Sequence, residues 1–155
     1  MRLLALMLAG ALAASAQPYN GPRPPKNDLP YLKHAENLVP TEPSEAKEEK
    51  GKKDEVTYVI TGATSTARTP LASPIFLLQA EKLNASSLQL YKLESRNGRC
   101  EITASPKKPM KPIRVEATRL DSSGLYKIEV IESLEPGEYS LSPEGSNQVF
   151  CFQVF

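Results

Sequence analysis

The stretch LEPGEYSL, residues 134 to 141, decides the fold that we predict for this chain. Pro136 and Gly137 indicate a turn, because proline fixes φ and glycine adopts conformations that other residues avoid. Tyr139 and Leu141 then point to one face of the strand that follows, since side chains alternate along a strand. The tyrosine ring can be buried on that face while its hydroxyl returns to an upstream backbone group. We therefore expect Tyr139, with Pro136 and Gly137, to fix a crossover between two sheets.

The segment LEPGEY resembles the tyrosine corner of immunoglobulin-like and fibronectin-type sandwiches. It is also similar to the PGxYxL ending of transthyretin-like sandwiches, which occur as accessory domains in secreted bacterial proteins. The chain departs from the antibody pattern, because it has no tryptophan and Leu141 stands where the second cysteine would be. The resemblance therefore implies a Greek-key sandwich and no particular family. The alternative is an ordinary turn before a buried tyrosine.

The sequence around this corner consists of short strand-like runs separated by turn signals. The runs are VTYVITG (56–62), PIFLLQA (74–80), LQLYKLES (88–95), CEIT (100–103), IRVEATRL (113–120), LYKIEVIE (125–132), EYSLS (138–142) and NQVFCFQVF (147–155). Asn97-Gly98 is a strong hairpin signal, because both central residues of the tight turn need a positive φ. Residues 121–124 and 143–146 mark two further hairpins. We predict an all-β fold, a single Greek-key (immunoglobulin-like) β-sandwich of seven to eight short strands over residues 55–155.

The first residues, MRLLALMLAGALAASA, have the pattern of a secretory signal peptide. Arg2 precedes an apolar run, and Ala14-Ser15-Ala16 supplies the small residues of a cleavage site. The run is shorter than the roughly 20 apolar residues that span a bilayer. We therefore favour cleavage after residue 16 over a membrane anchor, and we expect an exported chain, periplasmic or extracellular, without a transmembrane segment after cleavage.

Residues 17–54 are rich in proline, lysine and glutamate. Such a segment buries too little apolar surface to offset the cost of ordering it, so we predict a flexible arm. One helical turn is expected within residues 44–50. The more apolar island LPYLKHAENLVP, residues 29–40, can dock on the domain or on a partner, and we favour the view that it covers an edge of its own domain.

The chain has two cysteines, Cys100 and Cys151. An even count in an exported chain favours a disulfide. The bridge would close a loop of about 50 residues and stabilise the fold by roughly 4 kcal/mol. In the usual sheet order, however, one or two strands separate the two positions, whereas a disulfide needs Cα atoms within about 7 Å of each other. A bridge and two free thiols stay open as alternatives.

Residue types that common catalytic sites require are scarce in this sequence. The only histidine, His34, lies in the predicted arm, whereas triads and zinc sites hold histidine beside partners on a rigid scaffold. No glycine-rich phosphate loop or metal-binding Asp/Asn loop is present. A glycosidase pair could hide among the carboxylates near the corner, but exposed turns are rich in glutamate. These carboxylates are Glu129, Glu132, Glu135 and Glu138. We predict no enzyme, no cofactor and no metal site.

The loop SPKKPMKPIR, residues 105–114, is the candidate binding site. Its cationic residues are Lys107, Lys108, Lys111 and Arg114. Because prolines keep the loop extended, these side chains can contact anionic polymers or lipid headgroups; the alternative, which we favour, is a merely solvated loop. The formal net charge of +1 gives no global field for nucleic acid.

Together these features predict an exported, non-catalytic binding or interaction module at the cell envelope. Its partner is expected to be an unknown protein or an anionic envelope component. The alternatives are a small envelope enzyme or enzyme inhibitor with an unidentified active loop, and a subunit of a surface assembly.

Overall fold

The computed structural model describes residues 18–155, in which strands predominate. The predicted signal peptide, residues 1–16, lies outside the described residues. The strands are β1 (Tyr31–His34), β2 (Asn37–Pro40), β3 (Glu42–Glu45), β4 (Lys47–Lys50), β5 (Val56–Thr61), β6 (Arg68–Thr69), β7 (Ile75–Gln79), β8 (Leu88–Arg96), β9 (Arg99–Ala104), β10 (Val115–Arg119), β11 (Leu125–Val130), β12 (Gly137–Pro143) and β13 (Gln148–Val154). One short 3-10 helix, η1 (Ala85–Ser87), precedes β8. The predicted all-β class is confirmed.

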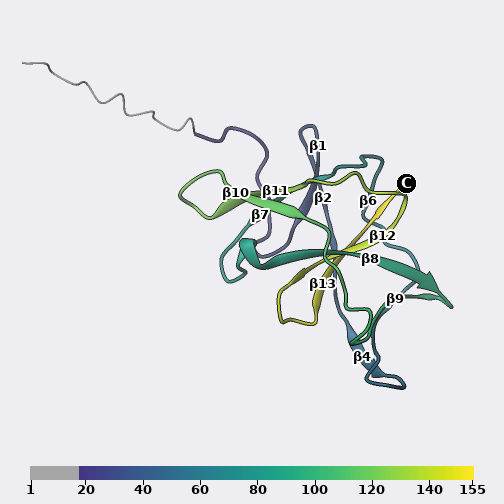
Figure 1. Ribbon diagram of the computed structural model, residues 1–155. Helices are drawn as coiled ribbons and strands as arrows, with labels where there is room; N and C mark the ends of the chain where they lie inside the picture. The colour runs from purple at the N-terminus through teal and green to yellow at the C-terminus, as the bar shows by residue number, and fades with distance from the viewer. Residues whose placement is uncertain (1–17) are drawn as a thin grey trace, which may run out of the picture.

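The strands form two sheets that pack face to face (Figure 1). The five-stranded sheet has the order β10-β11-β7-β1-β2, and all its neighbours are antiparallel. The second sheet has the order β3-β13-β12-β8-β9-β5-β4, with β6 parallel to the end of β13. The predicted sandwich is confirmed, with thirteen strands in place of the expected seven or eight.

The second sheet closes on itself. Its two edge strands, β3 and β4, are consecutive in the chain and only Ala46 lies between them. β3 pairs with β13 and β4 pairs with β5, while the Ala46 amide donates to the Asn147 carbonyl at 2.8 Å. Residues 42–50 therefore join both edges, so we call this second sheet the closed sheet. It has an outer face toward the five-stranded sheet and an inner face around its own interior.

The core between the two sheets is large and apolar, and we call it the sandwich core. Its largest fully buried side chains are Leu32, Phe76, Leu78, Leu90, Ile128, Tyr139, Leu141, Phe150 and Phe152. The Phe152 ring packs edge-on against Phe76 at 5.0 Å and stacks on Tyr139 at 5.7 Å between ring centroids. These contacts fix the closed sheet to the five-stranded sheet.

A smaller core fills part of the interior of the closed sheet. Its buried members are Ala46, Ile60, Leu93, Cys100, Val149 and Cys151. Strands β8 and β13 contribute to both cores, because alternate side chains point to opposite faces of a strand. In β13, Phe150 and Phe152 belong to the sandwich core, whereas Val149 and Cys151 belong to the inner one.

The stretch from Leu134 to Leu141 carries the chain from β11 in the five-stranded sheet to β12 in the closed sheet. Tyr139 is 1 % exposed, and its hydroxyl donates to the Glu135 carbonyl at 2.7 Å. This is the bond to an upstream backbone group that the sequence led us to expect. Gly137 has φ 157°, a value that residues with a side chain rarely adopt, so the turn requires glycine at this position.

Positive φ angles also shape two of the hairpin turns. Asn97 and Gly98, with φ 52° and 74°, join β8 to β9 in the predicted hairpin. Gly124 has φ 93°, and a Cβ there would lie 2.6 Å from the Ala80 carbonyl oxygen. Glycine is required at position 124 on both grounds, because other residues strain at this φ and the backbone approaches too closely.

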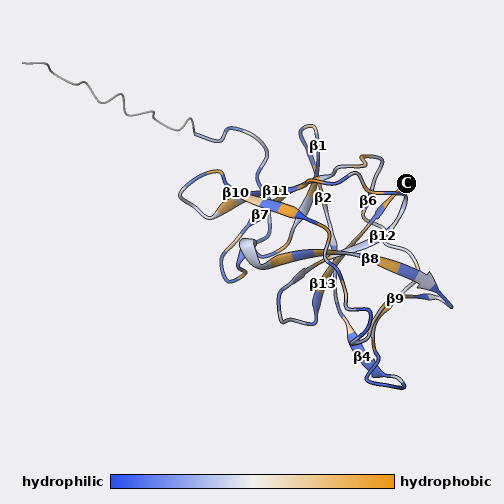
Figure 2. Cartoon of the chain, in the orientation of Figure 1, coloured by the Kyte–Doolittle hydropathy of each residue, from blue (hydrophilic) through white to orange (hydrophobic). Residues whose placement is uncertain are grey.

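The predicted flexible arm, residues 17–54, is wrong for most of its length. Residues 31–34 and 37–40 form a hairpin that adds to β7, and residues 42–50 close the second sheet. The expected helical turn at 44–50 is likewise replaced by β3 and β4. Exposed side chains on β4 gave the segment a disordered composition, and Figure 2 shows this end of the molecule as hydrophilic. Pairing with neighbouring strands orders it nonetheless.

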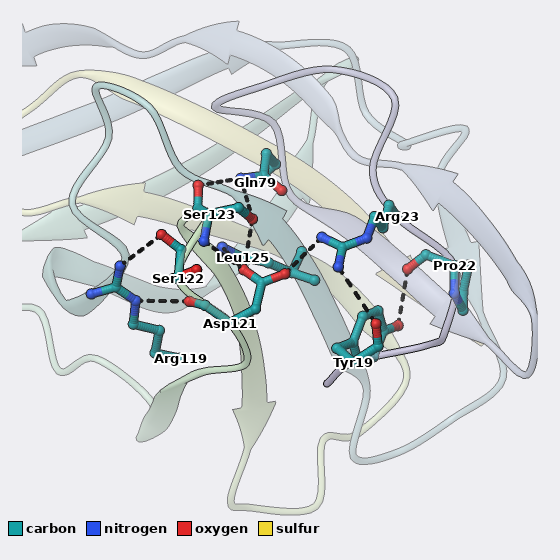
Figure 3. A network of polar contacts seen from close by, with 9 residues as sticks. All are labelled: Tyr19, Pro22, Arg23, Gln79, Arg119, Asp121, Ser122, Ser123 and Leu125. Atoms are coloured by element: carbon teal, nitrogen blue, oxygen red, sulfur yellow. Dashed lines mark hydrogen bonds and ion pairs between the residues drawn. The ribbon is translucent and has the colours of Figure 1, made fainter. Parts of the chain in front are cut away.

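The segment before β1 is tied to the five-stranded sheet by two carboxylates. Asp28 Oδ1 accepts hydrogen bonds from the backbone amides of Glu81, Lys82 and Leu83 at 2.8 to 3.0 Å. Arg23 reaches Asp121 in the β10–β11 turn at 2.7 Å, within the network that Figure 3 shows.

The Asp121 carboxylate also organises its own turn. It accepts hydrogen bonds from the Ser123 hydroxyl at 2.6 Å and from the Ser123 amide at 2.9 Å. The Ser123 hydroxyl and the Arg23 guanidinium lower the pKa of Asp121 to about 2. The carboxylate is therefore ionised at neutral pH and holds the start of the described chain against this turn.

Candidate functional site

The predicted basic loop, residues 105–114, connects β9 of the closed sheet to β10 of the five-stranded sheet. The structure leaves all four of its cationic side chains exposed, namely Lys107, Lys108, Lys111 and Arg114. Arg114 pairs with Glu116 at 3.2 Å. Among the described residues no hydrogen bond links these four side chains to one another. They are neighbours only because they lie on the same loop.

Cys100 and Cys151 are free, buried thiols. The predicted disulfide is therefore not formed, and the alternative of two free thiols describes the structure. They lie on β9 and β13, which are not neighbours in the closed sheet. Burial raises the pKa of the Cys100 thiol to about 11 and that of Cys151 to about 12, so both are protonated at neutral pH. A protonated thiol is a weak nucleophile.

The other residues considered for catalysis lie apart. His34 ends β1, and its Nε2 is 2.9 Å from the Thr69 hydroxyl. Glu132 and Glu135 are exposed, and Glu135 forms an ion pair with Lys92 at 2.8 Å. The expectation that all four glutamates are exposed is wrong for Glu138. This side chain is 6 % exposed on the inner face of the closed sheet, and it accepts a hydrogen bond from the Ser65 amide at 3.1 Å.

The interior of the closed sheet contains a cavity of about 250 Å³, which we call the chamber. Its buried lining residues are Ala46, Ile60, Leu93, Ser140, Ser142 and Val149. Half-buried Tyr58, Gln89, Tyr91, Ile102, Met110 and Pro143 form its walls, and exposed Glu48, Gly145, Ser146 and Asn147 form its rim. The chamber thus deepens from a solvent-exposed rim at the β12–β13 turn to a buried floor.

Two hydroxyls on the floor are free to bind a ligand. Ser140 is 2 % exposed and Ser142 is 9 % exposed, yet neither side chain has a hydrogen-bond partner among residues 18–155. No enclosed side-chain nitrogen or oxygen in the described part of the chain lacks a partner. The two hydroxyls therefore face the open space of the chamber, where a buried polar group without a partner is costly unless water or a ligand supplies one.

The chamber is nearly free of charge. Among the described lining residues Glu48 is the one charged side chain, and it stands at the rim. The Tyr91 hydroxyl donates to Gln89 Oε1 at 2.7 Å. Burial and the nearby carboxylate of Glu144 raise the pKa of Tyr91, so its phenol is neutral at neutral pH. The polar groups available inside are hydroxyls and amides, which both donate and accept hydrogen bonds.

A second, smaller cavity of about 120 Å³ lies at the other end of the interior. Ile60 and Leu93 line both cavities and separate them. Residues 61–65 cover this end, since the Ser65 hydroxyl donates to the Cys151 carbonyl at 3.2 Å and the Cys100 thiol to the Ala63 carbonyl at 3.4 Å. Burial raises the pKa of Glu138 here. No group of three or more metal-ligating side chains that could hold a metal ion occurs in residues 18–155.

Sequence reasoning missed the chamber. Its floor is formed by the polar positions of EYSLS, which alternate with Tyr139 and Leu141. Such alternation normally indicates one buried and one solvated face of an antiparallel sheet. The signal for a second interior lay in the run QLYKL, whose apolar and aromatic residues occupy both faces of the strand.

Comparison with known proteins gives no match to a family model, to a curated protein or to a solved structure. Arguments about function therefore rest on the geometry described above. None of the helices in the described chain has the length and apolar character needed to cross a membrane.

Proposed function

We propose that this chain is a non-catalytic binding module of the cell envelope and that the chamber of the closed sheet holds its ligand. The observation that supports this proposal is the pair of unpartnered hydroxyls, Ser140 and Ser142, on the floor of a cavity of about 250 Å³. Ligand sites in proteins are concave and mostly preformed, with a few polar groups that fix orientation. The chamber has these properties.

The chemistry of the lining favours an uncharged ligand. An ion brought into the chamber would lose its water, and the described lining contains no lysine or arginine to compensate a negative charge. Serine hydroxyls and the amides of Gln89 and Asn147 instead suit a molecule with hydroxyl groups of its own. Tyr58 and Tyr91 add aromatic rings against which an apolar face can pack.

Two further observations support the remaining parts of the proposal. Acid-base catalysis requires titratable groups positioned in the site. Among the described lining residues of the chamber the one carboxylate is Glu48, at the rim, and this supports a binding role without catalysis. Export to the periplasm or the cell surface is supported by the signal-peptide pattern of residues 1–16.

The proposal is tested by mapping ligand contacts on the protein in solution. We expect at least one of the methyl glycosides of glucose, galactose and N-acetylglucosamine to shift the backbone amide resonances of Ser140 and Ser142 in NMR spectra. Ser142→Leu should remove the shifts, since leucine fills the space above the floor, whereas Ser86→Leu on exposed η1 should keep them. Shifts confined to the five-stranded sheet, or none with any glycoside, would count against the chamber as the site.

A further inference from the structure

The loop of residues 105–114 brings free positive charge to the chamber. Its ten residues include four cationic side chains and no carboxylate. Among residues 18–155 Arg114 pairs with Glu116, whereas Lys107, Lys108 and Lys111 form no ion pair. These three exposed ammonium groups therefore have no ion-pair partner in the described chain, and Lys108 also borders a separate cavity together with Glu55 and Glu94.

The position of this loop is set by backbone hydrogen bonds at both ends. Ser105 and Lys108 each donate an amide to the other's carbonyl at 3.0 Å, and the Ile113 amide donates to the Leu90 carbonyl at 2.7 Å. Leu90 lies on β8 between two chamber residues, Gln89 and Tyr91. The loop consequently runs along this wall of the chamber.

Met110 connects the two features. Its side chain lines the chamber, and it lies between the two anchored ends of the loop. Lys111 is its immediate neighbour, and Lys107 and Lys108 precede it by two or three positions. The three lysines therefore flank, along the chain, a residue that lines the wall of the chamber.

We infer that the ligand is an anionic glycan whose uncharged terminal sugar enters the chamber while the negative groups that follow lie against Lys107, Lys108 and Lys111. This inference rests on the proposed function of the chamber. The sugar is assigned from the lining, which pairs tyrosine rings with hydroxyl and amide groups. The anion is assigned from the three unpaired lysines, because exposed like charges on one loop attract the opposite charge.

A lipid fits this arrangement less well. An acyl chain in the chamber would leave the hydroxyls of Ser140 and Ser142 without partners in an apolar contact. A glycan satisfies these groups and carries its charge outside. The structure thus favours the glycan over an anionic lipid surface as the partner of the basic loop.

The experiment compares neutral and anionic probes by isothermal titration calorimetry at low and high salt. The neutral probes are the same three methyl glycosides, and the anionic probes are the same hexoses linked through the anomeric oxygen to glycerol phosphate. We expect the parent protein to bind the anionic probe tighter by on the order of tenfold at low salt, with the difference falling as salt rises. Replacing Lys107, Lys108 and Lys111 by Gln should remove this difference and leave the neutral probe unaffected.

A matched control carries the same charge change elsewhere. Lys26→Gln, Lys33→Gln and Lys82→Gln, in and around the five-stranded sheet, should keep the preference for the anionic probe. Equal binding of both probes by the parent would overturn the inference and leave the proposed function in place. Binding of the anionic probe that survives Ser142→Leu would also overturn it, because the lysines would then act without the chamber. If no probe binds, both this inference and the proposed function of the chamber are wrong.

Discussion

The two faces of strands β8, β12 and β13 lie in very different surroundings. On the outer face Tyr139, Phe150 and Phe152 are at most 1 % exposed, and the rings of Tyr139 and Phe152 stack. On the inner face Ser140 and Ser142 are almost as deeply buried, yet their hydroxyls border an open cavity. The same backbone thus supports a close-packed core on one side and an incompletely filled chamber on the other.

This difference separates stability from binding within a small protein. Apolar contacts between the sheets can hold β8, β12 and β13 in place, because burial of apolar area is the dominant favourable term in folding. The inner face is then free to carry polar groups that await a partner, at a cost that the outer face offsets. A site built on strands that are fixed from behind is also well preorganised for a ligand.

The largest expected effect comes from removing the segment that closes the inner face. Deleting residues 17–54 leaves β13 without β3, β5 without β4 and β7 without β1. We expect the remaining fragment, residues 55–155, to lose its cooperative thermal transition, because it would expose strand edges and both cores. Far-ultraviolet circular dichroism during heating measures this. If the fragment still unfolds cooperatively, residues 17–54 are not needed for folding, and residues 55–155 form an independent domain.

The next prediction compares neighbouring residues on opposite faces. Phe152→Ala removes a ring that is 0 % exposed between Phe76 and Tyr139, and we expect it to lower the free energy of unfolding by about 3 to 5 kcal/mol. Ser140→Ala removes a hydroxyl that has no partner among the described residues, so we expect a change within about 0.5 kcal/mol. Urea unfolding of both variants measures the two values. Similar losses would show that the inner face is as tightly constrained as the outer one.

The sequence predicted one of these faces far better than the other. All eight expected runs are strands, because β-branched and aromatic residues between Gly, Asn and Pro turns are strong local signals. The Asn97-Gly98 hairpin and the Tyr139 hydrogen bond follow from chemistry contained in a few consecutive residues. Local patterns of this kind are visible without the fold.

The missed parts depend on contacts between distant residues. β3 and β4 have the composition of a charged linker. They form strands because their backbones hydrogen-bond to the edges of β13 and β5. Closure at Ala46, and with it the chamber, needs β13, which lies about 100 residues away in the chain, as well as the local hairpin of β4 and β5. For the same reason the sequence could not show that Cys100 and Cys151 are free. The strand order that keeps them apart is a property of the whole sheet.

A smaller loss than that of Phe152→Ala is expected at the corner that joins the two sheets. Tyr139→Phe keeps the ring in the sandwich core and removes one hydrogen bond, from the hydroxyl to the Glu135 carbonyl at 2.7 Å. We expect a loss of about 0.5 to 1.5 kcal/mol in the free energy of unfolding, the net contribution of one such bond. The Lys92–Glu135 ion pair remains in this variant and does not confound the result.

Tyr126→Phe on β11 is the matched control, because the Tyr126 hydroxyl forms no hydrogen bond with any residue of the described chain. Its urea midpoint should stay at the parental value while that of Tyr139→Phe falls. The corner hydroxyl acts on the connection between the sheets, so the loss should appear in global unfolding and leave glycoside binding in the chamber unchanged. An unmoved midpoint for Tyr139→Phe would mean that ring packing alone fixes the crossover, and the sandwich core would then hold the closed sheet without help from the corner.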